Sequence, residues 1–600
     1  MLYRHVVPGL MGRSGPAKAV VSDRINNIGH VLSREAFNTT RSWIDTVIPK
    51  PGNGFELGSP GLLRSLRFNM LPKYCTSTCI LVLVFSLHIS LLAADTPRLN
   101  DRHILVVVWD GMRPDFIGEE TTPTLWKLAR EGVAFRNHHP VYPSATMVNG
   151  TAMVTGVYPG KSGIIANYVY RPDIDAHNPI AVENPAVVKK GDQISHGKYI
   201  SVPTLAELVQ RGGGRTAVAS AKTVGLLLDR GSGIGPAKDC VTLFAGRALP
   251  DAILGPIASA LGSSPSAHLQ RDRWTTNAVT DFLWKHGVPT FSVLWLGEPD
   301  LTQHETAPGA PSALVAIKSS DDNLAAVLSA LGQQGLRKTT DVFVVSDHGF
   351  STINRSIDLR KILNDAGFAA NTEFKDKPGD IMLVGNGGTV LFYVGGHDAT
   401  VTSRLVEFLQ QSDFAGVIFT KPGLPGTFHL TDAKIDPPPS GDGAASNPNK
   451  PDVVMAFRWS DLKNQFGTPG MIDADWQRIA GEGTHATLSR FDMHNTLVAA
   501  GPDFRVGETD DLPTGNFDLA PTILQILGIE APQKMDGRVL SEAMVNGNHL
   551  PAIGKMETKT IEAKKDFAAG TWKQSLRISR VGSTIYLDEG NGAFSLKGSK

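Results

Sequence analysis

The sequence predicts an α/β protein with a doubly wound, mostly parallel sheet flanked by helices, with inserted loops and a small C-terminal hairpin. Three observations favour this class. Continuous apolar runs are typical of strands buried on both faces of a parallel sheet. Helical patterns alternate with these runs along the chain. The runs end in polar residues followed by glycine or a loop. Such sheets bind ligands at the edge where their strands end.

The composition agrees with a large globular protein. Lys plus Arg equals Asp plus Glu at 58 each, so the 600-residue chain has no excess charge to attract a polyanionic backbone, which argues against a nucleic-acid-binding module. A hydrophobic content of 41% and 61 glycines suit a sizeable core with many tight strand-to-helix turns.

The N-terminal region divides into two parts. Residues 1–69 show no sustained periodicity and are interpreted as a non-structural extension, whereas residues 70–94 have the pattern of a secretory signal peptide. Its apolar stretch, 80–92, is too short for a comfortable membrane span, so we expect export to the periplasm or the extracellular space and no stable span after removal. An uncleaved anchor is the alternative. Cys240 would be the one cysteine of the mature chain.

A catalytic domain is expected over residues 95–550. Its first predicted strand, 104–109, runs into Asp110 and Gly111, and a helix is predicted over 124–131 after Pro123. Asp110 is therefore placed at the end of a buried strand. A strand-end aspartate is also a common helix cap or turn residue, so Asp110 alone would not indicate a site.

Thr146 is the candidate nucleophile. The preceding Pro143 and Ser144 and the small and apolar residues that follow suggest a helix start, where backbone amides favour an anion. A threonine hydroxyl is a poor nucleophile unless a base or a cation activates it. The alternative is that Thr146 only caps the helix.

The middle of the chain continues the alternation of helix and strand. Helices are predicted over 204–211 and 273–286, and strands over 216–220 and 291–296. The last of these strands leads to Asp300 and His304, which one helical turn or a tight loop would aim in the same direction.

The second half repeats the pattern. After a helix over 313–331, the apolar run 342–346 ends at Asp347 and His348. Then follow a predicted helix at 358–367, a strand at 390–394, a Pro- and Gly-rich surface loop at 437–451, His485, a strand at 495–500 and a helix at 518–527. Residues 551–600 form a C-terminal appendage in which 571–578 and 583–587 predict a hairpin.

Three aspartates and three histidines in these positions suggest two metal sites around one nucleophile. Carboxylate oxygens and imidazole nitrogens are donors that zinc accepts, and two ions in one cleft would use most of these side chains. Zinc is the expected ion, although manganese and iron bind the same donors. His138 and His139, beside the Thr146 segment, are expected to be structural instead.

Five ordered motifs together resemble the type I phosphodiesterase/nucleotide pyrophosphatase family of the alkaline phosphatase superfamily. They span roughly residues 103 to 530 and are found at 107–111, at 143–149 with 154–159, at 298–304, at 346–349, and at 483–485 leading to 500–502. The resemblance implies an alkaline phosphatase-like fold and a metal-dependent phosphodiesterase or pyrophosphatase that forms a phosphothreonine intermediate. The implied substrate is a small phosphodiester or nucleotide-like molecule.

The resemblance also implies roles for individual residues. Asp300, His304 and His485 would hold one zinc ion. Asp110, Asp347 and His348 would hold the second, with Thr146 bound to it as the nucleophile. Asn149 would help to stabilise a phosphate oxygen.

Three positions depart from the family pattern: Ser162 replaces a common histidine, Gln303 a frequent glycine, and Ala486 the usual glycine after His485. None of them removes an implied ligand. Two alternatives stay open, a phosphomonoesterase of the same superfamily and a catalytically inactive binding protein on the same scaffold. A sulfatase is disfavoured because the Thr146 segment lacks the Cys/Ser-x-Pro-x-Arg context.

Overall fold

The computed structural model describes residues 102–598 apart from positions 376, 422, 437–449 and 551–552. The predicted extension at 1–69, the predicted signal peptide at 70–94 and most of the Pro- and Gly-rich loop lie outside the described residues. Cys240 is buried and is a free thiol.

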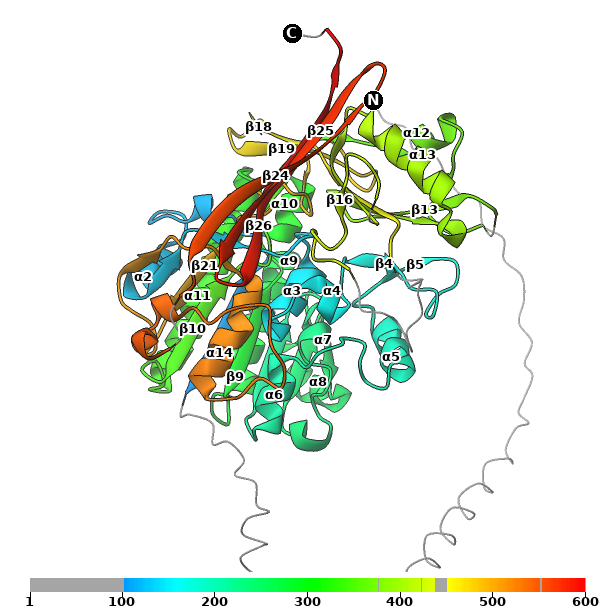
Figure 1. The fold of residues 1–600 in the computed structure, drawn as a ribbon. Helices are drawn as coiled ribbons and strands as arrows, with labels where there is room; N and C mark the ends of the chain where they lie inside the picture. Colours follow the sequence, from blue (N-terminus) through cyan, green and yellow to red (C-terminus); the bar gives the residue numbers. More distant parts are fainter. Residues whose placement is uncertain (1–101, 376, 422, 437–449, 551–552, 599–600) are drawn as a thin grey trace, which may run out of the picture. The chain divides into compact units, whose positions relative to one another are not determined.

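The largest sheet in the described part of the chain has nine strands, and the five at its centre run parallel (Figure 1). In spatial order the strands are β22 (Glu508–Asp510), β2 (Val133–Phe135), β21 (Leu497–Ala500), β10 (Thr340–Val345), β1 (His103–Trp109), β9 (Phe291–Leu296), β6 (Thr216–Ser220), β7 (Val241–Phe244) and β8 (Arg247–Leu249). The predicted mostly parallel sheet is confirmed, because β1, β9 and β10 are adjacent parallel neighbours.

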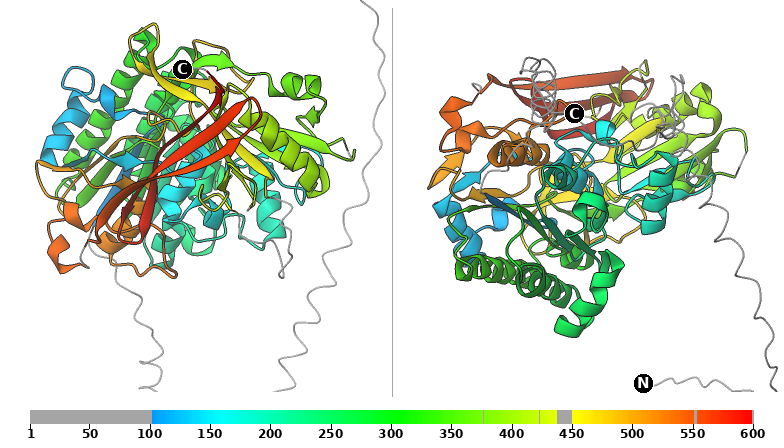
Figure 2. Two further views of the ribbon diagram at one scale, coloured as in Figure 1. Left: turned by 45° about the horizontal axis from the view of Figure 1, so that its top comes forward. Right: turned by 90° about the horizontal axis from the view of Figure 1, so that it is seen from below.

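Helices cover both faces of this sheet. Leu105 and Val107 of β1 share a hydrophobic cluster with α11 (Pro311–Gln333), whereas Val106 and Val108 share one with α14 (Leu519–Leu527). Since successive side chains of a strand point to opposite faces, the continuous apolar run is needed to bury both. Figure 2 shows the long α11 and the shorter α14 on opposite sides of the sheet.

The helices largely follow the predicted positions. They are α2 (Pro123–Glu131), α3 (Thr146–Thr155), α4 (Pro159–Ser162), α5 (Pro185–Ile194), α6 (Leu205–Arg211), α7 (Gly225–Leu228), α8 (Leu254–Leu261), α9 (His268–Asn277), α10 (Asp300–Glu305), α11 (Pro311–Gln333), α12 (Leu359–Asp365), α13 (Ala399–Gln410) and α14 (Leu519–Leu527). Thr204 and Asp358 accept N-cap hydrogen bonds at α6 and α12. The helix predicted over 273–286 begins earlier and continues as a π-helical segment, Ala278–Leu283.

Two predicted strands occupy unexpected places. The 495–500 strand is β21, which runs antiparallel to β10. The 390–394 strand is β14 (Thr389–Val394), which belongs to a separate six-stranded sheet and pairs antiparallel on both sides. An apolar run indicates burial on two faces but does not identify the sheet, because both sheets bury their central strands.

The segment between Asp347 and His485 supplies these extra layers. The six-stranded sheet has the order β12 (Ala369–Asn371), β13 (Asp380–Gly385), β14, β17 (Val453–Phe457), β15 (Ala415–Thr420) and β16 (Phe428–His429). A four-stranded sheet has the order β18 (Trp459–Lys463), β19 (Pro469–Ala474), β11 (Ser351–Ser356) and β20 (Gly483–Thr484). β20 leads directly into His485.

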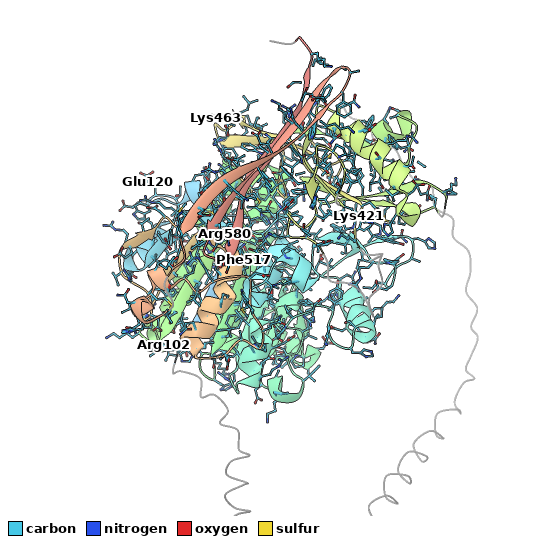
Figure 3. All side chains as sticks on the ribbon, in the orientation of Figure 1. Arg102, Glu120, Lys421, Lys463, Phe517 and Arg580 are labelled. Carbon is cyan, nitrogen blue, oxygen red and sulfur yellow. The ribbon has the colours of Figure 1, made fainter. Side chains whose placement is uncertain are left out.

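The C-terminal residues form a three-stranded antiparallel sheet. The predicted hairpin is confirmed as β25 (Gly570–Val581) and β26 (Thr584–Leu596), and β24 (Met556–Asp566) adds a strand that was not predicted. Tyr586 of β26 donates a hydrogen bond to Asp518, and its ring packs on Phe517, which Figure 3 labels beneath this sheet. The appendage is thus tied to the start of α14.

None of the helices between residues 102 and 598 that the structure describes has both the length and the hydropathy required to cross a bilayer.

Candidate active site

The candidate residues converge at the carboxyl ends of the parallel strands. Asp110 follows β1, Asp347 follows β10, and Asp300 begins α10 beyond β9. Since these three strands are neighbours, their ends meet at one edge. The backbone N–H of Asp300 donates to the carbonyl of Asp110 at 3.0 Å, which joins two of the loops directly.

Gly111 allows this close approach. Its φ of +69° lies in the left-handed region, and a Cβ there would lie 2.9 Å from Phe350 and 3.0 Å from the Cβ of Asp300. A larger residue would therefore be strained and would push the two loops apart.

The first predicted ligand group is assembled. One ligand atom from each of Asp300, His304 and His485 lies within 4.8 Å of the others. The Oδ1 atom of Asp300 is 3.3 Å from Nε2 of His304 and 3.6 Å from Nε2 of His485. The geometry fits three ligands to one cation.

The second predicted group surrounds His348. Its Nε2 atom lies 3.7 Å from Oδ1 of Asp110 and 3.2 Å from Oδ2 of Asp347. The hydroxyl of Thr146 is 3.3 Å from the same nitrogen. Asp110 and His348 can also share a cation with Asp300, so Asp300 lies between the two groups.

Carboxylate oxygens without hydrogen-bond partners point to metal ligation. Oδ1 of Asp110, Oδ1 of Asp300 and Oδ2 of Asp347 are buried and have none, and all three lie near histidine Nε2 atoms. The opposite oxygens are occupied: that of Asp110 accepts from Trp295 Nε1 at 2.8 Å, and that of Asp347 accepts from Gly111 N at 3.0 Å. Buried polar atoms are normally paired, so the donor set fits divalent cations with oxygen and nitrogen ligands.

The three histidines are oriented by the backbone. Nδ1 of His304, His348 and His485 lies 2.9, 2.9 and 2.8 Å from the carbonyls of Gly483, Gly349 and Ser144. A proton on Nδ1 leaves the Nε2 lone pair free for a metal ion, which is the usual outer-shell arrangement at metal-binding histidines.

Burial and charge shift the site's pKa values in different directions. Burial and the charge of Asp347 raise the pKa of Asp110 well above its usual value. Burial also acts on Asp300, but the charges of His304 and Lys222 hold the pKa of this carboxyl well below its usual range. Burial and the neighbouring His348 lower the pKa of His485, so its imidazole stays neutral, as a metal ligand must be.

Thr146 is the first residue of α3, and Ala145 occupies the N-cap position. The alternative that Thr146 only caps the helix is therefore wrong. Its hydroxyl points to His348 instead. The candidate nucleophile, the second candidate ligand group and the positive end of α3 meet at one point.

Asn149 does not face the site in the way the resemblance implied. Its amide nitrogen donates to the carbonyls of Val141, Pro143 and Ala145, and its oxygen accepts from Val141 N. These bonds use the side chain to fix the turn before α3. Asn167 lines the Thr146 pocket instead, and its oxygen accepts from the N–H of Met147.

Lys222 is a site residue that the sequence analysis missed. It follows β6, and its Nζ atom lies 3.0 Å from Oδ2 of Asp110 and 2.8 Å from Oδ2 of Asp300. These two carboxylates outweigh burial and raise the pKa of Lys222. Its position at the end of a predicted strand was the available signal, but lysine is not a zinc ligand.

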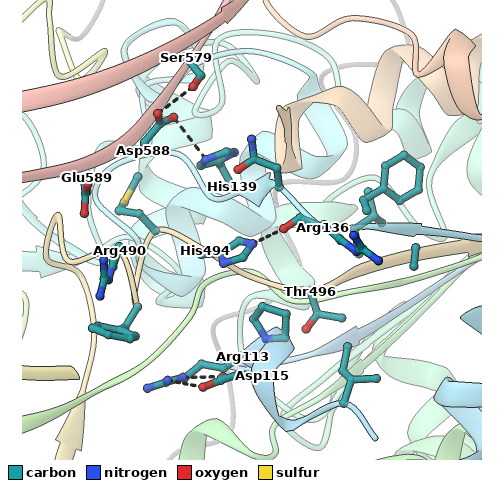
Figure 4. A pocket seen from close by; sticks show the side chains of 18 of the residues that line it. Arg113, Asp115, Arg136, His139, Arg490, His494, Thr496, Ser579, Asp588 and Glu589 are labelled. Carbon is teal, nitrogen blue, oxygen red and sulfur yellow. Dashed lines mark hydrogen bonds and ion pairs between the residues drawn. The ribbon is translucent and has the colours of Figure 1, made fainter. Parts of the chain in front are cut away.

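A pocket of about 250 Å³ opens beside Thr146. Its other lining residues include Asn167, Tyr168, Lys222, Asp300, His304 and His485. A larger pocket of about 740 Å³, lined by His139, His494 and Asp588 among others, contains none of the predicted ligands (Figure 4). His138 and His139 both have protein hydrogen-bonding partners, including Thr514.

The departures from the family pattern each have a local explanation or effect. Gln303 donates its amide to the carbonyl of Gly111 at 3.0 Å and so supports the Asp110 loop. Ser162 donates to the carbonyl of Pro159 within α4. Ala486 has a φ of +80°, a conformation that glycine adopts more easily, so the residue after His485 is strained.

Comparison with known proteins gives a consistent result. The family model described as type I phosphodiesterase/nucleotide pyrophosphatase matches residues 104–460. Ectonucleotide pyrophosphatase/phosphodiesterase family member 7 of Rattus norvegicus is 22% identical over 458 residues, which covers 76% of this chain and 90% of the relative. Venom phosphodiesterase of Macrovipera lebetinus is 23% identical over 490 residues, covering 78% and 48%.

Solved structures share the fold. Human ectonucleotide pyrophosphatase/phosphodiesterase 5 superimposes with a TM-score of 0.52 at 16% identity, covering 74% of this chain and 100% of that chain. The murine protein, solved as an inactive variant in complex with AMP, gives 0.51 at 18% identity, covering 72% and 96%. At these identities the likeness concerns the alkaline phosphatase-like fold alone.

Proposed function

The chain belongs to the type I phosphodiesterase/nucleotide pyrophosphatase family, a family of hydrolases of phosphoric ester bonds, and from that premise we propose that it cleaves phosphodiester or pyrophosphate bonds through a phosphothreonine intermediate at Thr146. One observation carries the proposal. Three buried carboxylate oxygens without hydrogen-bond partners face three histidine Nε2 atoms, and the Thr146 hydroxyl lies 3.3 Å from one of these nitrogens, that of His348.

Two divalent cations, for which we propose zinc, belong to this proposal. Asp300, His304 and His485 would hold one, and Asp110, Asp347 and His348 the other. Bound there, the cations would supply Lewis acidity that lowers the pKa of the Thr146 hydroxyl and stabilises charge on the phosphoryl oxygens.

The chain's own groups then carry the reaction. The Thr146 oxygen attacks phosphorus in line and gives its proton to a water molecule of the pocket, while the bond to the departing oxygen breaks and that oxygen takes up a proton from water. The positive end of α3 and the amide nitrogen of Asn167, whose oxygen accepts from Met147 N, would face the phosphoryl oxygens. Water then cleaves the phosphothreonine and restores the hydroxyl.

The pocket size and the proposed export fit this chemistry. A volume of about 250 Å³ beside Thr146 suits a small phosphodiester or nucleotide-like molecule. We propose that the mature protein acts in the periplasm or outside the cell. In either place the enzyme would hydrolyse such substrates without reaching the nucleotides of the cytoplasm.

The test compares a nitrophenyl nucleotide diester with a nitrophenyl phosphate monoester, using the zinc-saturated protein. Thr146→Ala should abolish turnover. Thr155→Ala is the matched control, because it removes a buried hydroxyl from the same helix. That hydroxyl donates to the carbonyl of Thr151. Diester preference lost in Thr146→Ala supports the proposal, monoester preference moves the protein to the phosphatase alternative, and inactivity on both supports the binding-protein alternative.

A further inference from the structure

Lys222 connects the two ligand groups. Its ammonium lies 3.0 Å from Asp110 Oδ2 and 2.8 Å from Asp300 Oδ2, one carboxylate from each group. The Oδ1 atoms of both aspartates stay on the side of the histidines. Lys222 therefore uses the oxygens that the proposed cations do not need, so cations and lysine can be present together.

Lys222 also forms part of the substrate pocket. It lines the same pocket as Thr146, and its side chain retains 16% exposure. The buried carboxylates prevent it from turning away, because leaving them would break two close ion pairs in a site with little water. The position of its charge relative to the nucleophile is therefore fixed.

Three other charged groups line this pocket. The Asp475 carboxylate accepts hydrogen bonds from Gly387 N and Gln477 N, and Arg478 donates to the carbonyl of His304. Glu183 lies on the pocket wall with one oxygen lacking a partner. Of the two cationic side chains on the wall, Lys222 is the one held against the aspartates of the ligand groups.

The charge of the two ligand groups together with Lys222 follows from these positions; on the rest of the wall Asp475 and Arg478 carry opposite charges, and Glu183 adds one negative charge when ionised. Two divalent cations bring four positive charges against the three carboxylates of Asp110, Asp300 and Asp347, which leaves one. Lys222 raises this balance to two. A phosphodiester carries one negative charge at phosphorus, whereas a phosphate monoester carries close to two above its second pKa of about 6.

Resting on the proposed function, we propose that Lys222 is a specificity-determining residue that shifts the site toward doubly charged phosphoryl groups. Its ammonium contributes a fixed positive charge in a partly buried position, where charges interact more strongly than in water. The enzyme should consequently bind inorganic phosphate well and hydrolyse phosphate monoesters alongside diesters.

The experiment measures binding without turnover. Inorganic phosphate and dimethyl phosphate, a dianion and a monoanion near pH 8, are titrated calorimetrically into the zinc-loaded protein, and kcat/KM is measured on the nitrophenyl monoester and diester. Lys222→Met should weaken phosphate binding by about tenfold relative to dimethyl phosphate and shift the kcat/KM ratio toward the diester by a similar factor. Lys222→Arg should preserve both ratios.

Two controls separate charge from folding. Lys361→Met removes an exposed lysine whose partner is Asp365 on α12. It changes the net charge by the same amount as Lys222→Met, but at a position outside the site. Zinc content and the melting temperature are measured for each variant, and ratios within one variant cancel any loss of active protein. Equal weakening of both ligands by Lys222→Met, or the same shift in Lys361→Met, would overturn the inference while leaving the diesterase proposal intact. A wild-type protein that binds neither ligand and hydrolyses neither ester would refute the proposed function and this inference with it.

Discussion

The indole of Trp295 donates a hydrogen bond to Asp110, one of the proposed metal ligands, and Trp295→Phe tests whether this bond holds the carboxylate in place. Nε1 of Trp295 donates to Oδ2 of Asp110 at 2.8 Å in a fully buried environment. This bond and the Lys222 ammonium occupy Oδ2, which turns Oδ1 toward His348. Phenylalanine retains most of the ring but has no donor. We therefore expect weaker metal binding at the site that contains Asp110.

The size of the effect follows from the bond that is lost. A hydrogen bond to a charged group contributes about 1.5 to 3 kcal/mol. Each factor of ten in affinity corresponds to about 1.4 kcal/mol. The variant should therefore bind zinc at the Asp110 site about tenfold to a hundredfold less tightly. This is the range seen when outer-shell partners of metal ligands are removed. Activity should return at saturating zinc.

Zinc affinity is measured by competition with a chromophoric chelator. Trp284→Phe is the matched control, since Trp284 is equally buried but donates to Ser292 rather than to a ligand. Loss of a few ring atoms then affects both variants alike. Unchanged zinc affinity in Trp295→Phe, or equal losses in the two variants, would refute the idea that this indole orients Asp110.

Further predictions concern stability and the two asparagines. Tyr586→Phe removes bonds to Asp518 and Arg538 and should lower the free energy of unfolding in urea by about 1 to 3 kcal/mol; a change below about 0.5 kcal/mol would argue against the clamp. Burial lowers the pKa of His138 in the folded protein to about 3, whereas the free imidazole of the unfolded chain has a pKa of about 6.5. Between these pH values the unfolded state binds more protons than the folded state. The free energy of unfolding should therefore fall as the pH drops from 6.5 toward 3. With a chelator present, His138→Gln should flatten that slope, and an unchanged slope would contradict it. Asn167→Ala should reduce kcat on the diester while keeping the melting temperature, whereas Asn149→Ala should lower the melting temperature; the reverse pattern would restore the role first expected for Asn149.

The positions of the proposed ligands could be predicted best where local pattern and topology coincide. Asp110 and Asp347 follow buried apolar runs, and parallel neighbours bring such ends together. The same rule applied to Lys222, because β6 was predicted at 216–220, but a search for metal donors passes over lysine. Sequence position alone therefore located the edge without identifying every residue that matters there.

Other features depended on tertiary packing. Asn149 and Asn167 both lie close to Thr146 in sequence, and only the turn before α3 decides that the Asn149 amide bonds to backbone carbonyls. The 390–394 strand has the burial pattern of a central strand in either sheet, so periodicity could not assign it to the six-stranded one. β24 is exposed along most of its length and has no apolar run to predict it.

The backbone carbonyls that orient the three histidines also influence how the gene can change. A carboxylate in that position can be lost by one base change, whereas a main-chain carbonyl is present whatever residue occupies Ser144. At Gly349 and Gly483 the carbonyl is also independent of the side chain, but a Cβ would clash with the backbone oxygens of Phe491 and Gln303, so these two loops depend on glycine for their path. The imidazoles are thus protected from the loss of an acceptor side chain, provided the loops keep their path. Asp110 lacks this protection, because its orientation depends on the side chains of Trp295 and Lys222. Substitutions that alter the site should therefore act first through the positions of its carboxylates. Selection for a different substrate would act most easily on the side chains that orient them.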